Sequence, residues 1–199
     1  MVASAEPLEG KSTVASNLGI AIAETGKQVL LIDADLRKPK VHDVFGVVND
    51  RGLSTFLSAR GSAGFHELIQ DTKVPRLFIL TSGPGSGKAA SLLHGPRMPE
   101  LLRRLRIEFE TILIDTPPML QLPDARLLGK MADQVILVVR SGKTSRDAAM
   151  AARQRFAEDG TRVLGTILNN WNPKSSPNGF YNSSYKSFSK HYASRSARA

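Results

Sequence analysis

Five short apolar runs alternate with longer segments of helical character, and this alternation constrains the fold more than any other feature of the chain. Each run is rich in leucine and β-branched residues, as expected for strands buried on both faces of a sheet. The runs are Val29 to Ile32, Leu77 to Leu80, Ile112 to Ile114, Val135 to Val139 and Val163 to Leu168. Because strands that alternate with helices form parallel sheets, the sequence predicts a doubly wound α/β fold.

The segments between these runs carry helical periodicity, and two of them are followed by a glycine that can stop a helix. They are Lys11 to Thr25, Arg97 to Arg106 and Thr144 to Glu158. Met1 to Ala5 is barely long enough for a strand, so the first strand is expected to be short. We predict one domain over residues 1–171.

The end of the chain differs in composition from the rest. Residues 172–199 are dominated by Ser, Asn, Pro, Gly, Lys and Tyr, which predicts a flexible tail. The whole chain carries 27 basic and 18 acidic residues and a net charge of +9. Five of the basic residues lie in this acid-free tail. The net positive charge therefore comes largely from the tail and is weak evidence for a nucleic-acid-binding face.

Composition also excludes several classes of site. The chain has no cysteine, which rules out disulfides, thiolate zinc sites and a cysteine nucleophile. Its four histidines are far apart in sequence, so a histidine metal site is not expected. No apolar run approaches the roughly 20 residues that span a bilayer, and we expect a chain that is soluble by itself and has no transmembrane segment.

Residues 5–12, with the sequence AEPLEGKS, fit the relaxed phosphate-loop pattern and lie between a predicted strand and a predicted helix. In such a loop, backbone N–H groups surround a phosphate at a helix N-terminus. Lys11 would reach the β- and γ-phosphates of a nucleotide, and the Ser12 hydroxyl would bind Mg²⁺. A similar segment at residues 83–89, GPGSGKA, offers no hydroxyl at its last position, and we interpret it as a turn.

Two of the predicted strands end in an aspartate, Asp33 and Asp115. Ligands bind at the carboxyl ends of the strands in open α/β sheets, so both acids are expected to face the phosphate loop. The alternative is that each acid caps the helix that follows. Together with the phosphate loop, the two acids favour a Mg²⁺–nucleotide site.

Three ordered motifs resemble those of the bacterial tyrosine kinases. They are the Walker A segment at residues 4–13, SAEPLEGKST, the Walker A′ segment at residues 31–39, LIDADLRKP, and the Walker B segment at residues 112–118, ILIDTPP. The Asp-x-Asp-x-Arg pattern formed by Asp33, Asp35 and Arg37 is the most specific part. The resemblance extends over roughly residues 3–170 and includes Pro123-Asp124-Ala125.

The resemblance implies a cytoplasmic, membrane-associated autokinase that uses Mg-ATP to phosphorylate tyrosines in its own tail. The acceptors would be Tyr181, Tyr185 and Tyr192. It also implies a role in exopolysaccharide or capsule synthesis and export. The implied partners are further copies of the chain, in a ring that phosphorylates in trans, a transmembrane adaptor at the inner face of the cell membrane, and a tyrosine phosphatase; nucleic acid is not expected.

Carried over residue by residue, the resemblance also implies the site. The residues that would bind the nucleotide are Glu9, Gly10, Lys11, Ser12, Thr13 and Asn169, the last as an adenine contact. Ser12, Asp33 and Asp115 would organise Mg²⁺. Catalysis would depend on Lys11, Asp33, Asp35 and Arg37.

Two alternatives remain beside the kinase. A partitioning or septum-positioning ATPase shares the fold, but its signature lysine would stand where this chain has Glu6. A non-catalytic ATP-dependent assembly module is the other, because Leu8 stands where the kinases usually have glycine. The segment that precedes the first strand in the kinases, with its oligomerisation motif, has no counterpart here, so weak self-association is expected.

Overall fold

The computed structural model describes residues 1–58 and 64–172. Met1–Asn169 form one compact unit, and a second unit begins at Asn170. The three predicted acceptor tyrosines, Tyr181, Tyr185 and Tyr192, lie outside the described residues.

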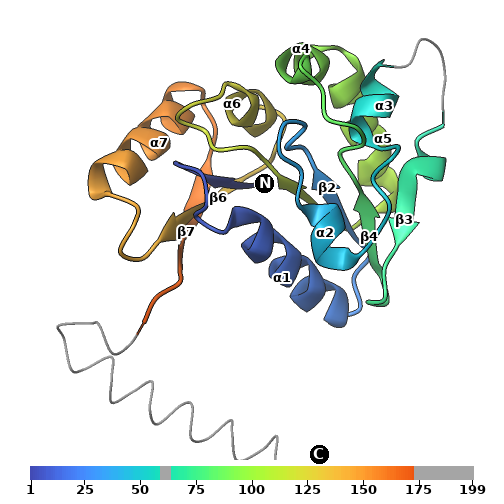
Figure 1. Cartoon of the computed structure of the whole chain (residues 1–199), viewed down its shortest axis with the longest axis horizontal. Coiled ribbons are helices and arrows are strands. Elements are labelled where there is room, and N and C mark those ends of the chain that lie inside the picture. Colours follow the sequence, from blue (N-terminus) through green and yellow to red (C-terminus); the bar gives the residue numbers. More distant parts are fainter. Residues whose placement is uncertain (59–63, 173–199) are drawn as a thin grey trace, which may run out of the picture. The chain divides into compact units, whose positions relative to one another are not determined.

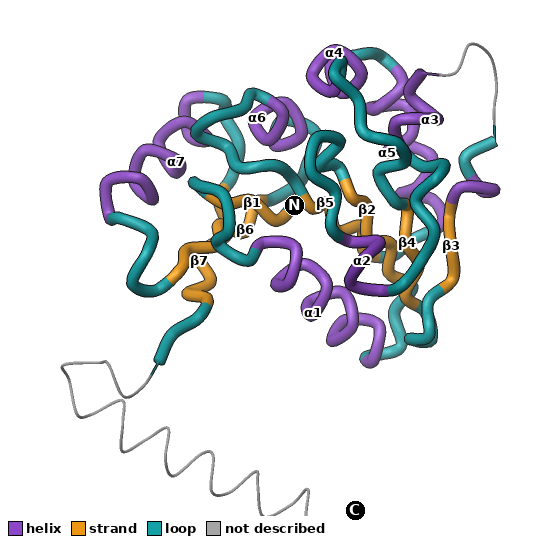
Figure 2. Tube along the Cα trace, in the orientation of Figure 1, coloured by secondary structure: helices purple, strands orange, loops and turns teal. Residues whose placement is uncertain are grey.

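A seven-stranded sheet forms the centre of the first unit, in the order β3-β4-β2-β5-β1-β6-β7 (Figure 2). All neighbouring pairs are parallel except β3 with β4. The strands are β1 (Val2–Ser4), β2 (Val29–Asp33), β3 (Ile69–Asp71), β4 (Leu77–Leu80), β5 (Thr111–Asp115), β6 (Val135–Arg140) and β7 (Val163–Asn169). The predicted doubly wound α/β class is confirmed.

Helices cover both faces of the sheet, with α1 on one side and α6 and α7 on the other (Figure 1). The helices are α1 (Lys11–Glu24), α2 (Val41–Phe45), α3 (Leu53–Ser58), α4 (Ala89–His94), α5 (Arg97–Glu108), α6 (Asp124–Gly129) and α7 (Arg146–Glu158), with a 3₁₀ turn at His66–Leu68. The core on the α1 side includes Ala15 and Leu31, and the core on the other side includes Leu105 and Phe156. Burial of both faces is why the strands are continuous apolar runs.

The sequence missed only short elements. β3 has only three residues, pairs antiparallel with β4 at the edge of the sheet and is partly exposed to solvent. α2, α3, α4 and α6 have five or six residues each, too few for helical periodicity to emerge. Residues 83–88 lie in the loop between β4 and α4, in line with the interpretation as a turn, and Ala89 is the first residue of α4.

The sheet register brings the two strand-end acids together. β2 and β5 are parallel neighbours, and Asp33 and Asp115 are directly paired positions in that register. Val2 of β1 pairs with Asp115 from the other side. Since the phosphate loop follows β1, the loop and both acids meet at the same edge of the sheet.

Candidate nucleotide site

The loop between β1 and α1 has the backbone of an anion-binding loop. Gly10 has a φ of 88° and precedes the first residue of α1. The backbone N–H groups of Leu8, Glu9 and Gly10 donate to no protein acceptor in the described part of the chain. Unpaired N–H groups at the N-terminus of a 14-residue helix attract an anion, so the loop fits a phosphate.

The carbonyl groups of this loop are held by residues that lie far away in the sequence. Arg140 Nη1 donates to the Leu8 carbonyl at 2.8 Å, and Asn169 Nδ2 donates to the Glu9 carbonyl at 2.9 Å. Lys143 Nζ lies 3.4 Å from the Pro7 carbonyl. These contacts orient the peptide units of the loop, with their carbonyl groups bound to β6, β7 and the segment after β6.

Glu9 acts inside the loop rather than at its surface. Its side chain is buried, accepts a hydrogen bond from the Glu6 N–H at 2.9 Å and accepts another from the Thr144 hydroxyl. Thr144 in turn accepts from the Arg140 N–H at 2.7 Å. A buried carboxylate needs such donors, so Glu9 fastens the loop to the start of α7.

Asp33 and Asp115 are both buried, but their surroundings differ. Asp33 accepts backbone hydrogen bonds from Lys40 and Val41 at 3.0 Å each and from Asp35 at 3.2 Å. It therefore caps the start of α2, which is the alternative that the sequence left open. Neither carboxylate oxygen of Asp115 makes a hydrogen bond of ordinary geometry with a described residue, although the Ser12 hydroxyl is near enough to favour its charged form.

Burial dominates the protonation of these two acids. Loss of hydration raises the pKa of Asp115 to about 7, while the nearby Lys11 ammonium and Ser12 hydroxyl oppose the rise. Burial raises the pKa of Asp33 to about 6, although its three backbone donors favour the charged form. A divalent cation beside Asp115 would replace the missing hydration.

Mg²⁺ fits the donor set at this position. Asp115 supplies an unpartnered buried carboxylate, and Ser12 supplies a hydroxyl close to it. No group of three or more histidine, aspartate or glutamate side chains that could hold a metal occurs in residues 1–58 and 64–172. Mg²⁺ is usually bound by one or two carboxylates together with water and substrate phosphates, so it does not need such a group.

The other two residues of the predicted catalytic set lie in the loop after β2. Lys11 Nζ lies 3.8 Å from Asp35 Oδ2. Arg37 Nε donates to Asp124 Oδ2 at 2.8 Å, and this hydrogen bond raises the pKa of the guanidinium further. Asp124 is the first residue of α6 and is buried.

A cavity of about 470 Å³ opens beside the phosphate loop. Gly10, Lys11, Ser12 and Thr13 line one part of it. Its other lining residues are Pro7, Leu8, Asp35, Arg37, Lys38, Lys40, Val44, Pro117, Pro118, Gln121 and Leu122. The structure thus brings the P-loop residues, Asp35 and Arg37 to one cavity, whereas Asn169 contacts the loop from outside it.

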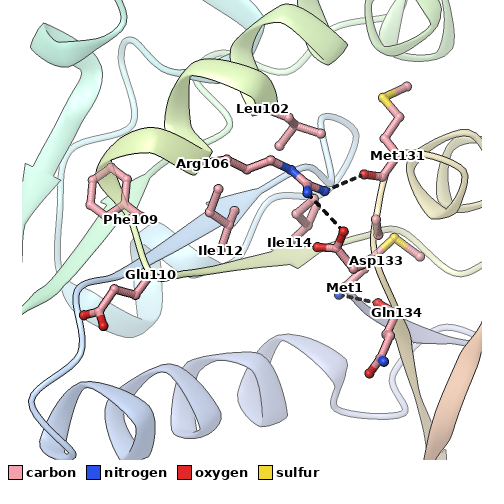
Figure 3. Close-up of a pocket in the computed structure, with 11 residues that line it drawn as sticks. Met1, Leu102, Arg106, Phe109, Glu110, Ile112, Ile114, Met131, Asp133 and Gln134 are labelled. Atoms are coloured by element: carbon pink, nitrogen blue, oxygen red, sulfur yellow. Dashed lines mark hydrogen bonds and ion pairs between the residues drawn. The ribbon is translucent and has the colours of Figure 1, made fainter.

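A second cavity of about 410 Å³ lies at the amino ends of β5 and β6, the edge of the sheet opposite the phosphate loop (Figure 3). Arg106 crosses it and pairs with Asp133 at 3.0 Å. The Met1 ammonium donates to the Gln134 carbonyl at 2.9 Å. These groups are already paired with one another, and the cavity does not contribute to the nucleotide site.

Sequence reasoning did not assign a role to Arg140, Thr144 or Asp124. Arg140 ends β6 as Asp33 and Asp115 end their strands, so its position at the end of an apolar run was a usable signal. Asp124 belongs to the Pro123-Asp124-Ala125 segment of the family resemblance, but its partner Arg37 is 87 positions away and could not be read from the sequence. Thr144 gave no signal, because the residue that it contacts is 135 positions away.

The chain is similar in sequence to known proteins. A family model described as an AAA domain matches residues 9–154. The tyrosine-protein kinase YwqD of Bacillus subtilis is 42% identical over 169 residues, which are 85% of this chain and 70% of the relative.

Two solved structures share the fold. The kinase domain of the Escherichia coli tyrosine kinase ETK is 32% identical with a TM-score of 0.83, and the match covers 89% of this chain and 69% of that one. The septum site-determining protein MinD of Pyrococcus horikoshii, complexed with Mg-ADP, is 27% identical with a TM-score of 0.72 over 86% of this chain and 69% of that one.

The fold and the phosphate loop define a P-loop nucleotide-binding protein with a doubly wound sheet. Within that class, the chain belongs to the bacterial tyrosine kinase family. The kinase interpretation is thereby supported over the partitioning ATPase and the assembly module. Across residues 1–58 and 64–172, no helix is both long and apolar enough to cross a membrane.

Proposed function

We propose that this chain is a Mg-ATP-dependent protein-tyrosine kinase whose nucleotide site lies at the carboxyl ends of β1, β2 and β5. The observation that carries the proposal is the unpartnered, buried carboxylate of Asp115 next to Ser12 and Lys11 of the phosphate loop. An isolated carboxylate in this position is costly unless a cation joins it.

The phosphate loop would bind the triphosphate. The free N–H groups of Leu8, Glu9 and Gly10 would surround the β-phosphate, and Lys11 would leave Asp35 for the β- and γ-phosphates. Ser12 and Asp115 would hold Mg²⁺. Mg²⁺ neutralises charge on the β- and γ-phosphates when bound. Glu9 would hold the loop in shape, and Thr13 and Asn169 would complete the nucleotide contacts.

Asp35 is the better placed of the two Walker A′ acids to meet an acceptor hydroxyl. It lines the cavity, whereas Asp33 is fully buried and caps α2. The tyrosine oxygen would attack the γ-phosphorus, and the bond from phosphorus to the β,γ-bridging oxygen would break. Asp35 would accept the phenolic proton, and ADP would leave. Arg37 would stabilise charge on the transferred group.

The acceptors that we propose are Tyr181, Tyr185 and Tyr192, presented by one copy of the chain to another. Their phosphorylation would add about −1.5 to −2 charges each and cancel the basic charge of residues 173–199. In the cell, the chain would work with a transmembrane adaptor and a phosphatase in polysaccharide export. Membership of the tyrosine kinase family supports this assignment.

Intact-mass analysis after incubation with Mg-ATP tests the proposal. The wild-type chain should gain phosphate on tyrosine, and Lys11→Met should gain none, because the loop loses its side-chain cation. Changing Tyr181, Tyr185 and Tyr192 together to phenylalanine should remove phosphotyrosine while leaving the Kd for Mg-ATP unchanged. Phosphate that persists on the triple variant would contradict the acceptor assignment, and a wild-type chain that binds ATP without gaining phosphate would indicate an assembly module.

A further inference from the structure

Leu8 has an unusual backbone and an unusual side chain for its position. Its φ of 63° is in the left-handed region, which costs a non-glycine residue about 1 kcal/mol or more. The side chain is 76% exposed, so it packs little within the fold. Backbone strain of this kind often occurs at functional sites, where the strained residue contributes to binding or catalysis.

Three other apolar side chains line the same cavity, and they come from two other segments. Val44 lies on α2 and is 51% exposed, while Pro118 and Leu122 lie between β5 and α6. Together with Leu8 they form the apolar wall, the name used below for these four residues. A single exposed leucine would need no explanation. Four apolar residues from three loops and helices around one cavity indicate a binding surface.

The apolar wall lies on the acceptor side of the phosphate loop. Lys11 reaches into the cavity beside Asp35, which marks the end of the site where the γ-phosphate would bind. Asn169, the predicted adenine contact, does not line the cavity and touches the Glu9 carbonyl instead. The apolar wall therefore borders the space next to the γ-phosphate rather than the space for the base.

We propose that the apolar wall binds the aromatic ring of the acceptor tyrosine, an inference that rests on the proposed kinase function. A tyrosine side chain has an apolar ring and one polar end. The cavity offers the matching arrangement, since Leu8, Val44, Pro118 and Leu122 supply apolar contact and Asp35 receives the hydroxyl. A serine side chain has no ring to contact the apolar wall, so the wall selects tyrosine.

Peptides with and without a ring test this subsite. The probe is a peptide of residues 189–196, in which Tyr192 is the only Phe, Tyr or Trp, with analogues carrying Tyr192→Phe and Tyr192→Ala. The wild-type chain should phosphorylate the tyrosine peptide. The phenylalanine peptide should inhibit with a Ki within about threefold of the KM, and the alanine peptide should inhibit at least about tenfold more weakly, because ring burial accounts for much of the binding.

Leu8→Gly and Val44→Ser should each raise the KM for the tyrosine peptide by about fivefold or more. In each variant, the Ki of the phenylalanine peptide should rise by the same factor as the KM. Calorimetry on Val44→Ser should give a Kd for Mg-ATP within twofold of wild type. Val48→Ser is the matched control, because Val48 is 62% exposed but does not line the cavity.

Several results would overturn the proposal. These are an unchanged KM in both variants, equal inhibition by the alanine and phenylalanine peptides, or a rise in KM that Val48→Ser reproduces. If the wild-type chain transfers no phosphate to any tyrosine, the proposed kinase function fails. In that case, calorimetry in the presence of Mg-ADP tests the subsite separately from the kinase activity. Tighter binding of the phenylalanine peptide than of the alanine peptide would support the apolar wall, and equal Kd values would reject it.

Discussion

Arg37 Nε lies 2.8 Å from Oδ2 of Asp124, an ion pair that joins the loop after β2 to the first residue of α6. The carboxylate is buried, whereas the arginine side chain keeps 32% of its surface exposed. Arg37 also lines the cavity beside the phosphate loop. Asp124 therefore acts as a positioning residue, which holds the guanidinium where a transferred phosphoryl group would pass.

Asp124→Asn should reduce the rate of phosphate transfer about tenfold or more, because even a small displacement of the Arg37 guanidinium would lower the rate strongly. The free energy of unfolding should fall by about 1–2 kcal/mol, since Arg37 can turn to water. Transfer rate, the Kd for Mg-ATP and urea unfolding measure the three effects. Asp159→Asn is the control, because it breaks the ion pairs of Asp159 with Arg126 of α6 and with Lys130, which do not involve the cavity. An equal loss of transfer in both variants would contradict the positioning role.

Mg²⁺ should stabilise the protein more at pH 8 than at pH 6. The folded-state pKa values of Asp115 and Asp33, about 7 and about 6, exceed their ordinary value of 3.8. Their contribution to stability is therefore complete below pH 3.8 and is lost as the pH rises through 6 to 7. Mg²⁺ competes with the proton on Asp115, so its effect on Tm should grow over that interval. Thermal unfolding of wild type and Asp115→Asn measures it, and a pH-independent Mg²⁺ shift in wild type would contradict the assignment.

Gly10→Ala should destabilise the phosphate loop and abolish Mg-ATP binding. A Cβ at Gly10 would lie 2.0 Å from Asn169 Nδ2, and the φ of 88° disfavours any side chain. The expected loss of stability is about 1–3 kcal/mol. Adding Asn169→Ala removes the clash but not the backbone strain, so the double variant should recover only part of the loss. Full recovery of stability would show that the backbone at Gly10 is unstrained.

Thr144→Val should lower the free energy of unfolding by about 1–3 kcal/mol, because the buried Glu9 carboxylate loses its hydroxyl donor. The Kd for Mg-ATP should rise as well, since Glu9 belongs to the loop that would bind phosphate. Thr25→Val is the control: its hydroxyl donates to the Ile22 carbonyl at the exposed end of α1. Chemical denaturation and calorimetry compare the two, and equal effects would contradict a role for Thr144 in shaping the loop.

Much of this protein follows from local patterns in its sequence. Apolar runs and helical periodicity predicted five of the seven strands and the three long helices, because each pattern repeats within one element. The short first strand was expected from its place before the phosphate loop, which leaves β3 as the missed strand. The phosphate loop and the strand-end acids were also readable, since a parallel sheet brings the carboxyl ends of its strands to one edge. The roles of individual site residues and of the tail tyrosines stay predictions.

Contacts between distant segments could be decided only by tertiary structure. Asp33 and Asp115 look alike in the sequence, yet both oxygens of Asp33 accept backbone hydrogen bonds, from Asp35 and from the start of α2, while neither oxygen of Asp115 makes a hydrogen bond of ordinary geometry with a described residue. The pairs Arg37–Asp124 and Glu9–Thr144 join residues 87 and 135 positions apart, so no local pattern encodes them. The strand-ending pattern brings these acids to one edge of the sheet, but whether each is capped, paired or left for a cation depends on which donors the fold brings beside it.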